Sequence, residues 1–258
     1  MSIRIPAALS LLGFTLSLAP TAHSQTCTEI IRQTARQAHH TISAAELRIP
    51  EKARQHFEKA RTASERKEPD TFARESAKAL AVAPRYADVY LLRAAWELRE
   101  GRYEAVLDTV AQARTIQSQL PWSAILIASA LNQLHRYTEA VAELDRARSE
   151  EADSWQARYE RARAETGRHD VGAALHWSEL AVAAAPVGCT DARLVRANAL
   201  QLAGQQTAVI AELETYLTLD RQGTRRTQVQ ALIQAQSQTL DHARGTTGEL
   251  DQGLLAMK

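Results

Sequence analysis

The sequence predicts an all-α fold, an elongated α-solenoid assembled from repeated pairs of antiparallel helices. Composition is the first reason. The 258 residues include only ten glycines and seven prolines, while the strong helix formers alanine, leucine, arginine, glutamine and glutamate recur throughout. Valine, isoleucine and aromatic residues are too scattered to alternate as a strand requires. The second reason is an internal repeat with a period of about 34 residues.

Two series of alanines carry this repeat. The first series is Ala60, Ala94, Ala128, Ala162 and Ala197, and its intervals are equal except for the last, which is one residue longer. The second keeps the same interval throughout, at Ala79, Ala113, Ala147 and Ala181. Small residues at fixed places let two antiparallel helices approach closely where they cross. A fixed interval of this length predicts a helix–turn–helix unit.

An Arg-Tyr pair returns with the same period. It stands at 102–103 and again at 136–137, one full interval later. Each pair follows one predicted helix and precedes the next. We therefore expect Tyr103 and Tyr137 to wedge the turn between two antiparallel helices, with Val106 and Ala140 packing behind them.

The first 24 residues have the layout of a secretory signal peptide. Arg4 precedes an apolar run over 7–19 that is too short to span a bilayer, and small residues close the segment at Ala22 and Ser24. We expect cleavage after Ser24 and an exported protein, periplasmic or secreted; an uncleaved membrane anchor is the alternative. Residues 25–49 are predicted to form an N-terminal helix followed by an extended segment.

The helix–turn–helix units are predicted over residues 50–222. Placing the first-series alanine eighth in each unit gives starts near 53, 87, 121, 155 and 190. The turn between the two helices has a glycine at Gly101 and Gly204, replaced by His135 and His169 in the third and fourth units. This pattern resembles the tetratricopeptide repeat (TPR). The resemblance implies about five units stacked in a right-handed superhelix.

Some residues depart from the TPR pattern. Lys59, Arg93 and Arg161 occupy a site where the family prefers leucine, and the turn of the first unit, KEPD, is irregular. The slip of one residue before the fifth unit predicts a longer loop at 187–191. Glu150 and Glu151 lie at a unit junction, where we expect a solvated loop.

The C-terminal region predicts a cap for the solenoid. Val229, Leu232, Ile233 and Leu240 stand near helical spacing. The apolar face at the end of a solenoid needs a cover with a polar outer side, so we assign residues 223–242 to a capping helix. The tail at 243–258 contains three glycines and no apolar stripe, and we expect it to be disordered.

Charge and cysteine content restrict the partners. Without Arg4 the chain has 30 basic residues (31 − 1) against 30 acidic ones, so no net field attracts nucleic acid or an anionic membrane. No apolar run after the signal segment is long enough to span a membrane. Cys27 and Cys189 stand far apart in the sequence. Free thiols, or pairing with another chain, are favoured over an intrachain bridge in the oxidising compartment.

No residue pattern predicts catalysis. His39-His40 lacks further ligands at metal-binding spacing, and His169, Asp170 and Ser178 lack the strained elbow of a nucleophile. Phosphate-binding glycine motifs are absent from the sequence, and the basic stretch 221–228 is read as a soluble surface. We predict no enzyme activity, no cofactor and no metal site.

The TPR resemblance does imply a binding face. In that family the first helix of each unit lines a concave groove, and the corresponding positions here mix aromatic, basic and amide side chains that suit an extended peptide. These candidate groove residues are Phe57, Arg61, Leu91, Arg99, Trp122, Ile125, Asn132, Gln133, Tyr159, Arg163 and Asn198.

Two functions follow from this face. The favoured one is a non-enzymatic scaffold or adaptor that binds a protein or peptide segment in the groove within the cell envelope. The alternative is a self-associating structural or chaperone-like envelope component, which makes a homo-oligomer. Neither reading names the partner.

Overall fold

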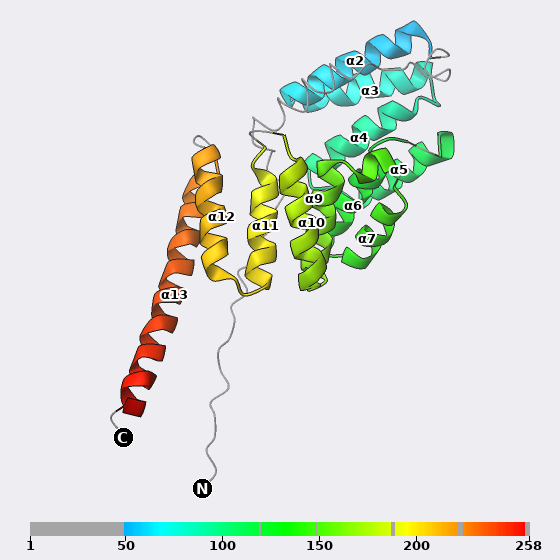
Figure 1. The fold of residues 1–258 in the computed structure, drawn as a ribbon. Helices are drawn as coiled ribbons and strands as arrows, with labels where there is room; N and C mark the ends of the chain where they lie inside the picture. Colours follow the sequence, from blue (N-terminus) through cyan, green and yellow to red (C-terminus); the bar gives the residue numbers. More distant parts are fainter. Residues whose placement is uncertain (1–48, 119, 148, 187–188, 221–223, 256–258) are drawn as a thin grey trace.

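The computed structural model describes residues 49–118, 120–147, 149–186, 189–220 and 224–255, and every regular element in this part is a helix (Figure 1). The predicted signal peptide, the N-terminal helix with its extended segment, and His39-His40 lie outside the described residues. Within them, no helix is long and apolar enough to cross a membrane.

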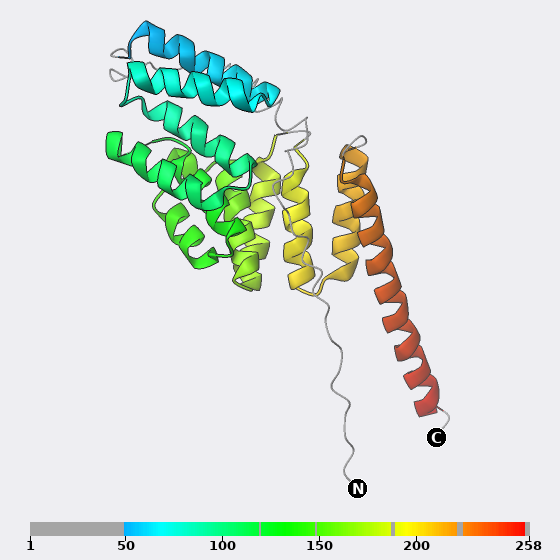
Figure 2. The same ribbon diagram turned by 180° about the vertical axis from the view of Figure 1, so that it is seen from behind.

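The helices form five antiparallel pairs that stack side by side along a curved solenoid (Figures 1 and 2). The predicted unit starts each fall within two residues of the start of a first helix. The pairs are α2 (Glu51–Arg66) with α3 (Pro69–Val82), α4 (Ala87–Arg99) with α5 (Tyr103–Ile116), α6 (Ser123–Gln133) with α7 (Tyr137–Asp145), α9 (Trp155–Gly167) with α10 (Val171–Ala184), and α11 (Asp191–Leu202) with α12 (Gln206–Leu219).

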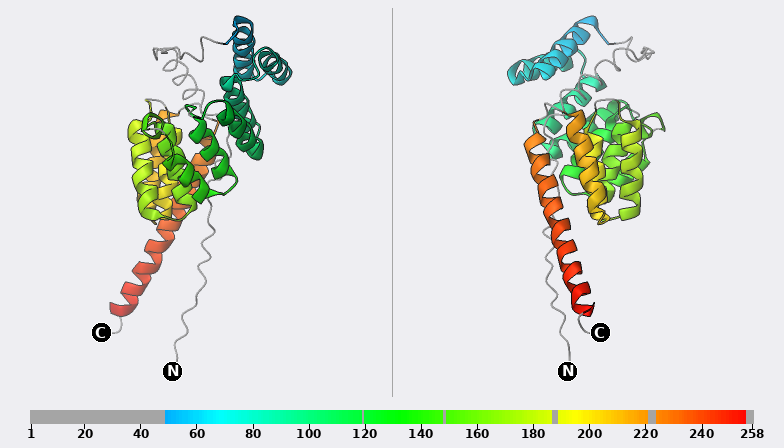
Figure 3. Two further views of the ribbon diagram at one scale, coloured as in Figure 1. Left: turned by 90° about the vertical axis from the view of Figure 1, so that its right-hand side faces the viewer. Right: turned by 60° about the vertical axis from the view of Figure 1, so that its left-hand side comes forward.

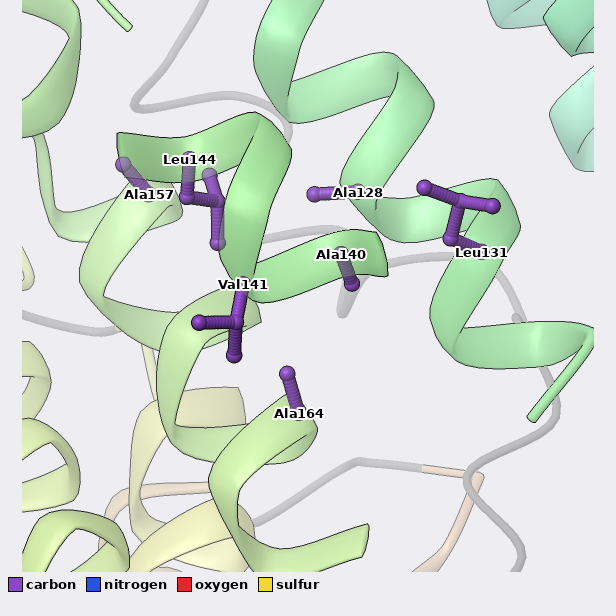
Figure 4. Packing of buried hydrophobic residues seen from close by; sticks show 7 residues of the cluster. All are labelled: Ala128, Leu131, Ala140, Val141, Leu144, Ala157 and Ala164. Atoms are coloured by element: carbon purple, nitrogen blue, oxygen red, sulfur yellow. The ribbon is translucent and has the colours of Figure 1, made fainter. Parts of the chain in front are cut away.

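The two alanine series form the interior of the solenoid. All members of the first series are at most 1 % exposed, and so are Ala79, Ala113 and Ala181 of the second. Ala147 is the exception, half-buried beyond the end of α7. Figure 4 shows Leu131, Val141 and neighbouring small residues from α6, α7 and α9 gathered in one apolar cluster. Alanine at the crossings therefore lets larger residues fill the space around them.

Each first helix is followed by a left-handed residue. The φ angles are 58° to 74° at Lys67, Gly101, His135, His169 and Gly204, and these positions recur at the interval of the first alanine series. The irregular turn of the first unit thus has the same backbone as the others. Glycine suits this conformation because it has no Cβ to clash with the following carbonyl.

The repeated tyrosine joins one unit to the next. Tyr137 begins α7, and its ring lies so close to Gly167 at the end of α9 that a Cβ there would stand 2.5 Å from the ring. Tyr103 begins α5 and packs on a cluster that contains Val106 of α5 and Ala130 of α6. Tyr137 therefore does more than wedge the turn of its own unit, because its ring lies against the first helix of the following unit.

Arginines at the position where the TPR family prefers leucine bridge neighbouring helices. The Arg161 guanidinium lies 5.2 Å from the centre of the Trp177 ring on α10, and it pairs with Asp145 of α7 and with Glu165. At the same site of the fifth unit, Arg196 lies 3.7 Å from Glu212 of α12. At Arg161 and Arg196, a charge or ring on the second helix of the unit thus compensates for the absent leucine.

A second polar brace recurs within units. His56 Nδ1 lies 2.8 Å from Glu75 Oε2, and Arg193 Nη1 donates to Glu212 Oε1 over 2.8 Å. Both pairs are 19 residues apart and join the first helix of a unit to its second. Hydrogen bonds to His56 and then Lys78 lower the pKa of Glu75 to about 2. The carboxylate form of Glu75 therefore stabilises the fold.

The junction between the third and fourth units corrects one expectation. Trp122 precedes α6 with φ 68° and supplies no side-chain cap. Instead, Glu151 of the short helix α8 (Ser149–Ala152) accepts hydrogen bonds from the amides of Ala124 and Ile125 at 3.0 and 3.1 Å. Glu151 is therefore half-buried rather than part of a solvated loop, and burial raises the pKa of its carboxyl group.

The capping helix is present and longer than expected. α13 (Arg226–Leu255) packs the fully buried Val229 onto a cluster with Leu194, Leu213 and Tyr216. It continues as helix where a disordered tail was predicted for 243–258, because no proline interrupts residues 226–255. Figures 1 and 3 show its distal half running beyond the end of α12.

The turn conformation predicts a specific effect of Gly204→Ala. No atom lies within 4 Å of a Cβ built on Gly204, whose φ is 71°. Backbone strain alone should lower the free energy of unfolding by about 1 kcal/mol, as measured by urea denaturation. Gly172→Ala in α10 is the matched control, since its Cβ also has room. An equal effect of both substitutions contradicts the strain argument.

The lowered pKa of Glu75 predicts how stability depends on pH. Because the folded-state pKa is about 2 against an ordinary 4.5, the stabilisation is complete above pH 4.5 and is lost as the pH falls towards 2. Glu75→Gln should therefore destabilise most at pH 7, with the difference from wild type shrinking below pH 4.5. Urea unfolding at several pH values measures this, with the exposed Glu104→Gln as control. A difference independent of pH refutes it.

Candidate functional site

The candidate groove residues are spread along the first helices α2, α4, α6, α9 and α11 and the residue before α6. The structure brings three of them together, namely Asn132, Tyr159 and Arg163. The other eight contact the cores of separate units, their own helices or solvent. The centre of the candidate site is therefore the contact between α6 and α9.

A buried polar network links α6 to α9. Asn132 Nδ2 donates to the main-chain oxygen of Glu160 at 2.9 Å and to its Oε2 at 2.8 Å. Arg163 Nη1 donates to the same Oε2 at 2.9 Å. Asn132 is 3 % exposed and Glu160 6 %, so these bonds form away from bulk water. The guanidinium and the amide together satisfy the buried carboxylate.

Asn132 also carries an unused acceptor. Its Oδ1 is buried and has no hydrogen-bond partner. A buried acceptor left unpaired is unfavourable by about 1–3 kcal/mol, and such atoms are rare in folded proteins. Any donor that reaches Asn132 Oδ1 would therefore relieve a cost that the folded chain by itself leaves in place.

Tyr159 gives the network an apolar border. Its ring lies 6.1 Å from that of Trp155 in an edge-on arrangement, and it packs against a cluster that includes Cys189. The Arg163 guanidinium lies 5.8 Å from the Tyr159 ring centre. Burial raises the pKa of the Tyr159 hydroxyl, so the phenol stays neutral. Tyr159 and Arg163 therefore lie beside the Glu160 carboxylate that joins α9 to α6.

Sequence reasoning missed Glu160. Glu160 is buried and accepts hydrogen bonds from Asn132 and Arg163, whereas acidic residues are usually exposed to solvent. The sequence signal for it is weak: Glu160 and Arg163 stand three residues apart on one helix, a spacing that also occurs on exposed faces. Only the neighbouring helix, through Asn132, shows that this pair is buried.

Four other candidates support the solenoid itself. Phe57 packs 5.2 Å from Tyr86 between ring centres. Leu91 and Ile125 pack against the apolar clusters of their units. Arg99 Nη1 donates to the Ser64 carbonyl of the first unit at 2.8 Å. A role of these residues in binding stays a prediction.

The remaining candidates differ in exposure. Arg61 is exposed and bonds to Glu58 and Glu65 of its own helix. Gln133 and Asn198 are half-buried. Trp122 is 50 % exposed, and its positive φ of 68° is unusual for a bulky side chain. Trp122 is therefore the largest apolar surface that the candidate set presents to solvent.

The structure does not assemble the residues weighed for catalysis. Asp170 Oδ1 accepts from the Ala173 amide as the N-cap of α10, and the fully buried Ser178 donates to the Leu175 carbonyl. His169 is exposed in its turn. In the described part of the chain, no three His, Cys, Asp or Glu side chains gather as metal ligands do.

An open hollow of about 370 Å³ lies apart from this network, between α2 and α3. Its lining mixes the basic residues Lys59, Arg66 and Arg74 with Glu58, Glu68 and Glu75. Charges of both signs offset one another there. The hollow therefore shows no preference for a cation or an anion.

The cysteine expectation needs a correction. Cys189 is disulfide-bonded, and the described part of the chain contains no free cysteine. The favoured prediction of a free thiol is therefore wrong for Cys189. Cys27 lies outside the described residues.

The paired helices, the left-handed turns and the terminal cap define a TPR-type α-solenoid. Known structures of TPR proteins have this fold at low sequence identity. PilW, a widely conserved type IV pilus biogenesis factor, matches with a TM-score of 0.62 and 16 % identity, over 74 % of this chain and 94 % of that one. MamA 41-end from Desulfovibrio magneticus RS-1 matches with a TM-score of 0.56 and 11 % identity, over 68 % of this chain and 99 % of that one.

Yeast Tom70 matches with a TM-score of 0.58 and 14 % identity, over 83 % of this chain and 47 % of that one. Identities this low establish the fold alone. No protein-family model matches the sequence, and no curated protein matches it.

Burial predicts the energetic weight of the Glu160–Arg163 pair. Glu160→Ala leaves the Arg163 charge buried without its carboxylate and removes one of the two acceptors of the Asn132 amide, and should lower the free energy of unfolding by about 3 kcal/mol. Glu139→Ala is the matched control, because Glu139 forms an exposed pair with Arg136 at the same spacing. It should have no measurable effect. Similar losses for both variants in urea denaturation contradict the assigned burial.

Proposed function

We propose that this protein is a non-enzymatic scaffold that binds an extended segment of another protein along its first helices. Trp122 is the observation that carries the proposal, because half of its surface is exposed at the start of α6 while its backbone has a positive φ of 68°. Its side chain does not cap the helix either. A strained, exposed indole contributes little to folding and is typical of a residue that serves binding.

The network beneath this face keeps it rigid. Asn132, Glu160 and Arg163 fix α6 against α9 through hydrogen bonds that are largely removed from water. A face that is already ordered loses little conformational entropy when a ligand binds. The α6–α9 contact therefore offers a preorganised surface.

The surroundings suit a peptide better than a small polar ligand. The half-buried Tyr159 borders the network, and Trp122 supplies a second aromatic ring at the start of α6. Aromatic anchors dominate the binding energy of many peptide complexes. An extended peptide also offers one main-chain N–H donor per residue other than proline.

The same proposal places the protein in the cell envelope. The signal-peptide layout of residues 1–24 favours export. The disulfide at Cys189 supports an oxidising compartment, where such bonds persist. PilW, a type IV pilus biogenesis factor of similar fold, is a precedent for such a solenoid in pilus biogenesis.

Self-association is the second candidate function. The distal half of α13 runs beyond α12 in every view (Figures 1, 2 and 3). A second copy placed along this helix would give it the neighbour that the solenoid does not supply. This contact would lie at the C-terminal end, away from Trp122.

Site-specific photo-crosslinking tests the peptide-binding proposal. A benzoylphenylalanine at Trp122 should crosslink to another protein in an envelope extract of the source organism. Leu219 on the second helix α12 is the matched control, since Leu219 and Trp122 are both apolar and both 50 % exposed. Mass spectrometry identifies the adducts.

The adducts separate the candidate functions. One recurring partner at position 122 and none at position 219 supports the scaffold. Equal yields at both positions, or no adduct at 122, contradict binding along the first helices. Adducts between two copies of this chain favour self-association instead.

A further inference from the structure

The turn that leads into α6 holds Trp122 in a backbone conformation unusual for its side chain. The Ser123 amide donates to the Leu120 carbonyl over 3.4 Å, which closes a four-residue turn with Pro121 and Trp122 at its centre. Trp122 has φ 68° and ψ -5°. Proline followed by a left-handed residue is typical of a type II turn, whose left-handed position usually holds glycine or asparagine. Trp122 therefore needs contacts from elsewhere to keep this backbone.

Glu151 takes the place of an N-cap side chain for α6. Trp122 stands at the N-cap position and forms no side-chain cap. Glu151 Oε1 instead accepts from the amides of Ala124 and Ile125 at 3.0 and 3.1 Å. These are the second and third residues of the helix, whose amides an N-cap serine or aspartate would bond. One carboxylate oxygen from α8 thus secures the first turn of α6.

Arg114 of α5 fixes the first residue of α6. Its Nη2 donates to Ser123 Oγ at 3.0 Å and to Glu143 Oε1 of α7 at 2.5 Å. Ser123 is 3 % exposed, and Leu120 at the other end of the turn is 2 % exposed. Both ends of the turn are therefore buried and held, while Trp122 between them is half exposed.

We propose that Glu151 and Arg114 are positioning residues, which hold the start of α6 so that Trp122 stays in its left-handed conformation with half of its surface exposed. The anchor of the candidate site is then formed before a partner arrives, and binding costs little conformational entropy. The proposal rests on the proposed function only in assigning Trp122 to binding.

Stability alone does not account for the Glu151 carboxylate. Burial raises the pKa of this group, and this effect outweighs the two amide hydrogen bonds and the attraction of Arg114, while Glu143 adds repulsion. Because the folded-state pKa is raised, the ionised form costs stability at pH values above it. An uncharged acceptor of the same length would form the same two bonds. The contribution of Glu151 is therefore the reach of its acceptor rather than its charge.

Two substitutions at position 151 separate reach from charge. Glu151→Gln keeps an acceptor at the same distance from the backbone, whereas Glu151→Asp keeps the charge and shortens the side chain by one methylene. Hydrogen exchange of the Ala124 and Ile125 amides should be about tenfold faster in Glu151→Asp than in the wild type, because the first turn of α6 then opens more often. It should be unchanged in Glu151→Gln. Equal exchange in all three proteins overturns the assignment of Glu151.

Fluorine NMR measures the consequence at Trp122. In protein labelled with fluorotryptophan, Trp122→Phe identifies the resonance of Trp122 among the four tryptophans. That resonance should be the same single line in the wild type and in Glu151→Gln, and should shift or split in Glu151→Asp and in Arg114→Ala.

Asp170→Ala is the matched control for this measurement. It removes the side-chain cap of α10 and should lower stability without changing the Trp122 resonance. A resonance that no substitution at 114 or 151 changes, or that Asp170→Ala changes equally, overturns the proposal.

Photo-crosslinking connects the position of residue 122 to binding. With benzoylphenylalanine at Trp122, Glu151→Asp should give several-fold fewer partner adducts in envelope extract, and Glu151→Gln an unchanged yield. Unchanged yields in both overturn the positioning role and leave the scaffold standing. If the protein with neither substitution gives no adduct, the scaffold fails. Hydrogen exchange and the fluorine resonance need no partner, so they still decide whether Glu151 holds Trp122.

Discussion

The close approach of paired helices at alanine crossings is the constraint on which this structure depends. A methyl group fits where the first and second helices of a unit cross, and the buried alanines recur at that place in each unit. Once the alanines have set the distance between the two helices, larger residues such as Leu131 and Val141 fill the space around the crossing. Units of equal length then stack in register, and the stacked first helices present a continuous face.

Polar residues maintain this stacking where the apolar pattern departs from the family. Arg161 reaches the Trp177 ring and Asp145, while Glu151 of α8 caps the start of α6. These contacts are directional, so each requires a particular geometry between helices. The third and fourth units, which contain most of them, also form the candidate site. Fixed polar geometry serves both the architecture and the binding face there.

A solenoid gives each unit contact mainly with its neighbours, and long-range ties are correspondingly important. The disulfide at Cys189, which directly precedes Thr190 and α11, is a covalent tie at the start of the fifth unit. A covalent cross-link stabilises the fold mainly by restricting the unfolded chain.

Much of the fold was predictable because it is local. Helix propensity, the constant interval of the repeat and the turn residues act within a few turns of chain, so the unit boundaries and the buried alanines followed from the sequence. The end of α13 was misjudged, since three glycines weaken a helix without ending it. The turn at Lys67, which looks irregular in sequence, has the same left-handed backbone as the other turns. That conformation depends on how the helix ends, and residues other than glycine adopt it here.

The sequence by itself determined the helical class, the unit length and the set of residues on the first helices. Only the tertiary structure decided which of those residues meet. Asn132 and Glu160 are 28 residues apart, and their contact depends on how α9 packs on α6. Spacing along one helix defines a face, but the distance between two helices is set by all the side chains packed between them, and no short stretch of sequence contains that information.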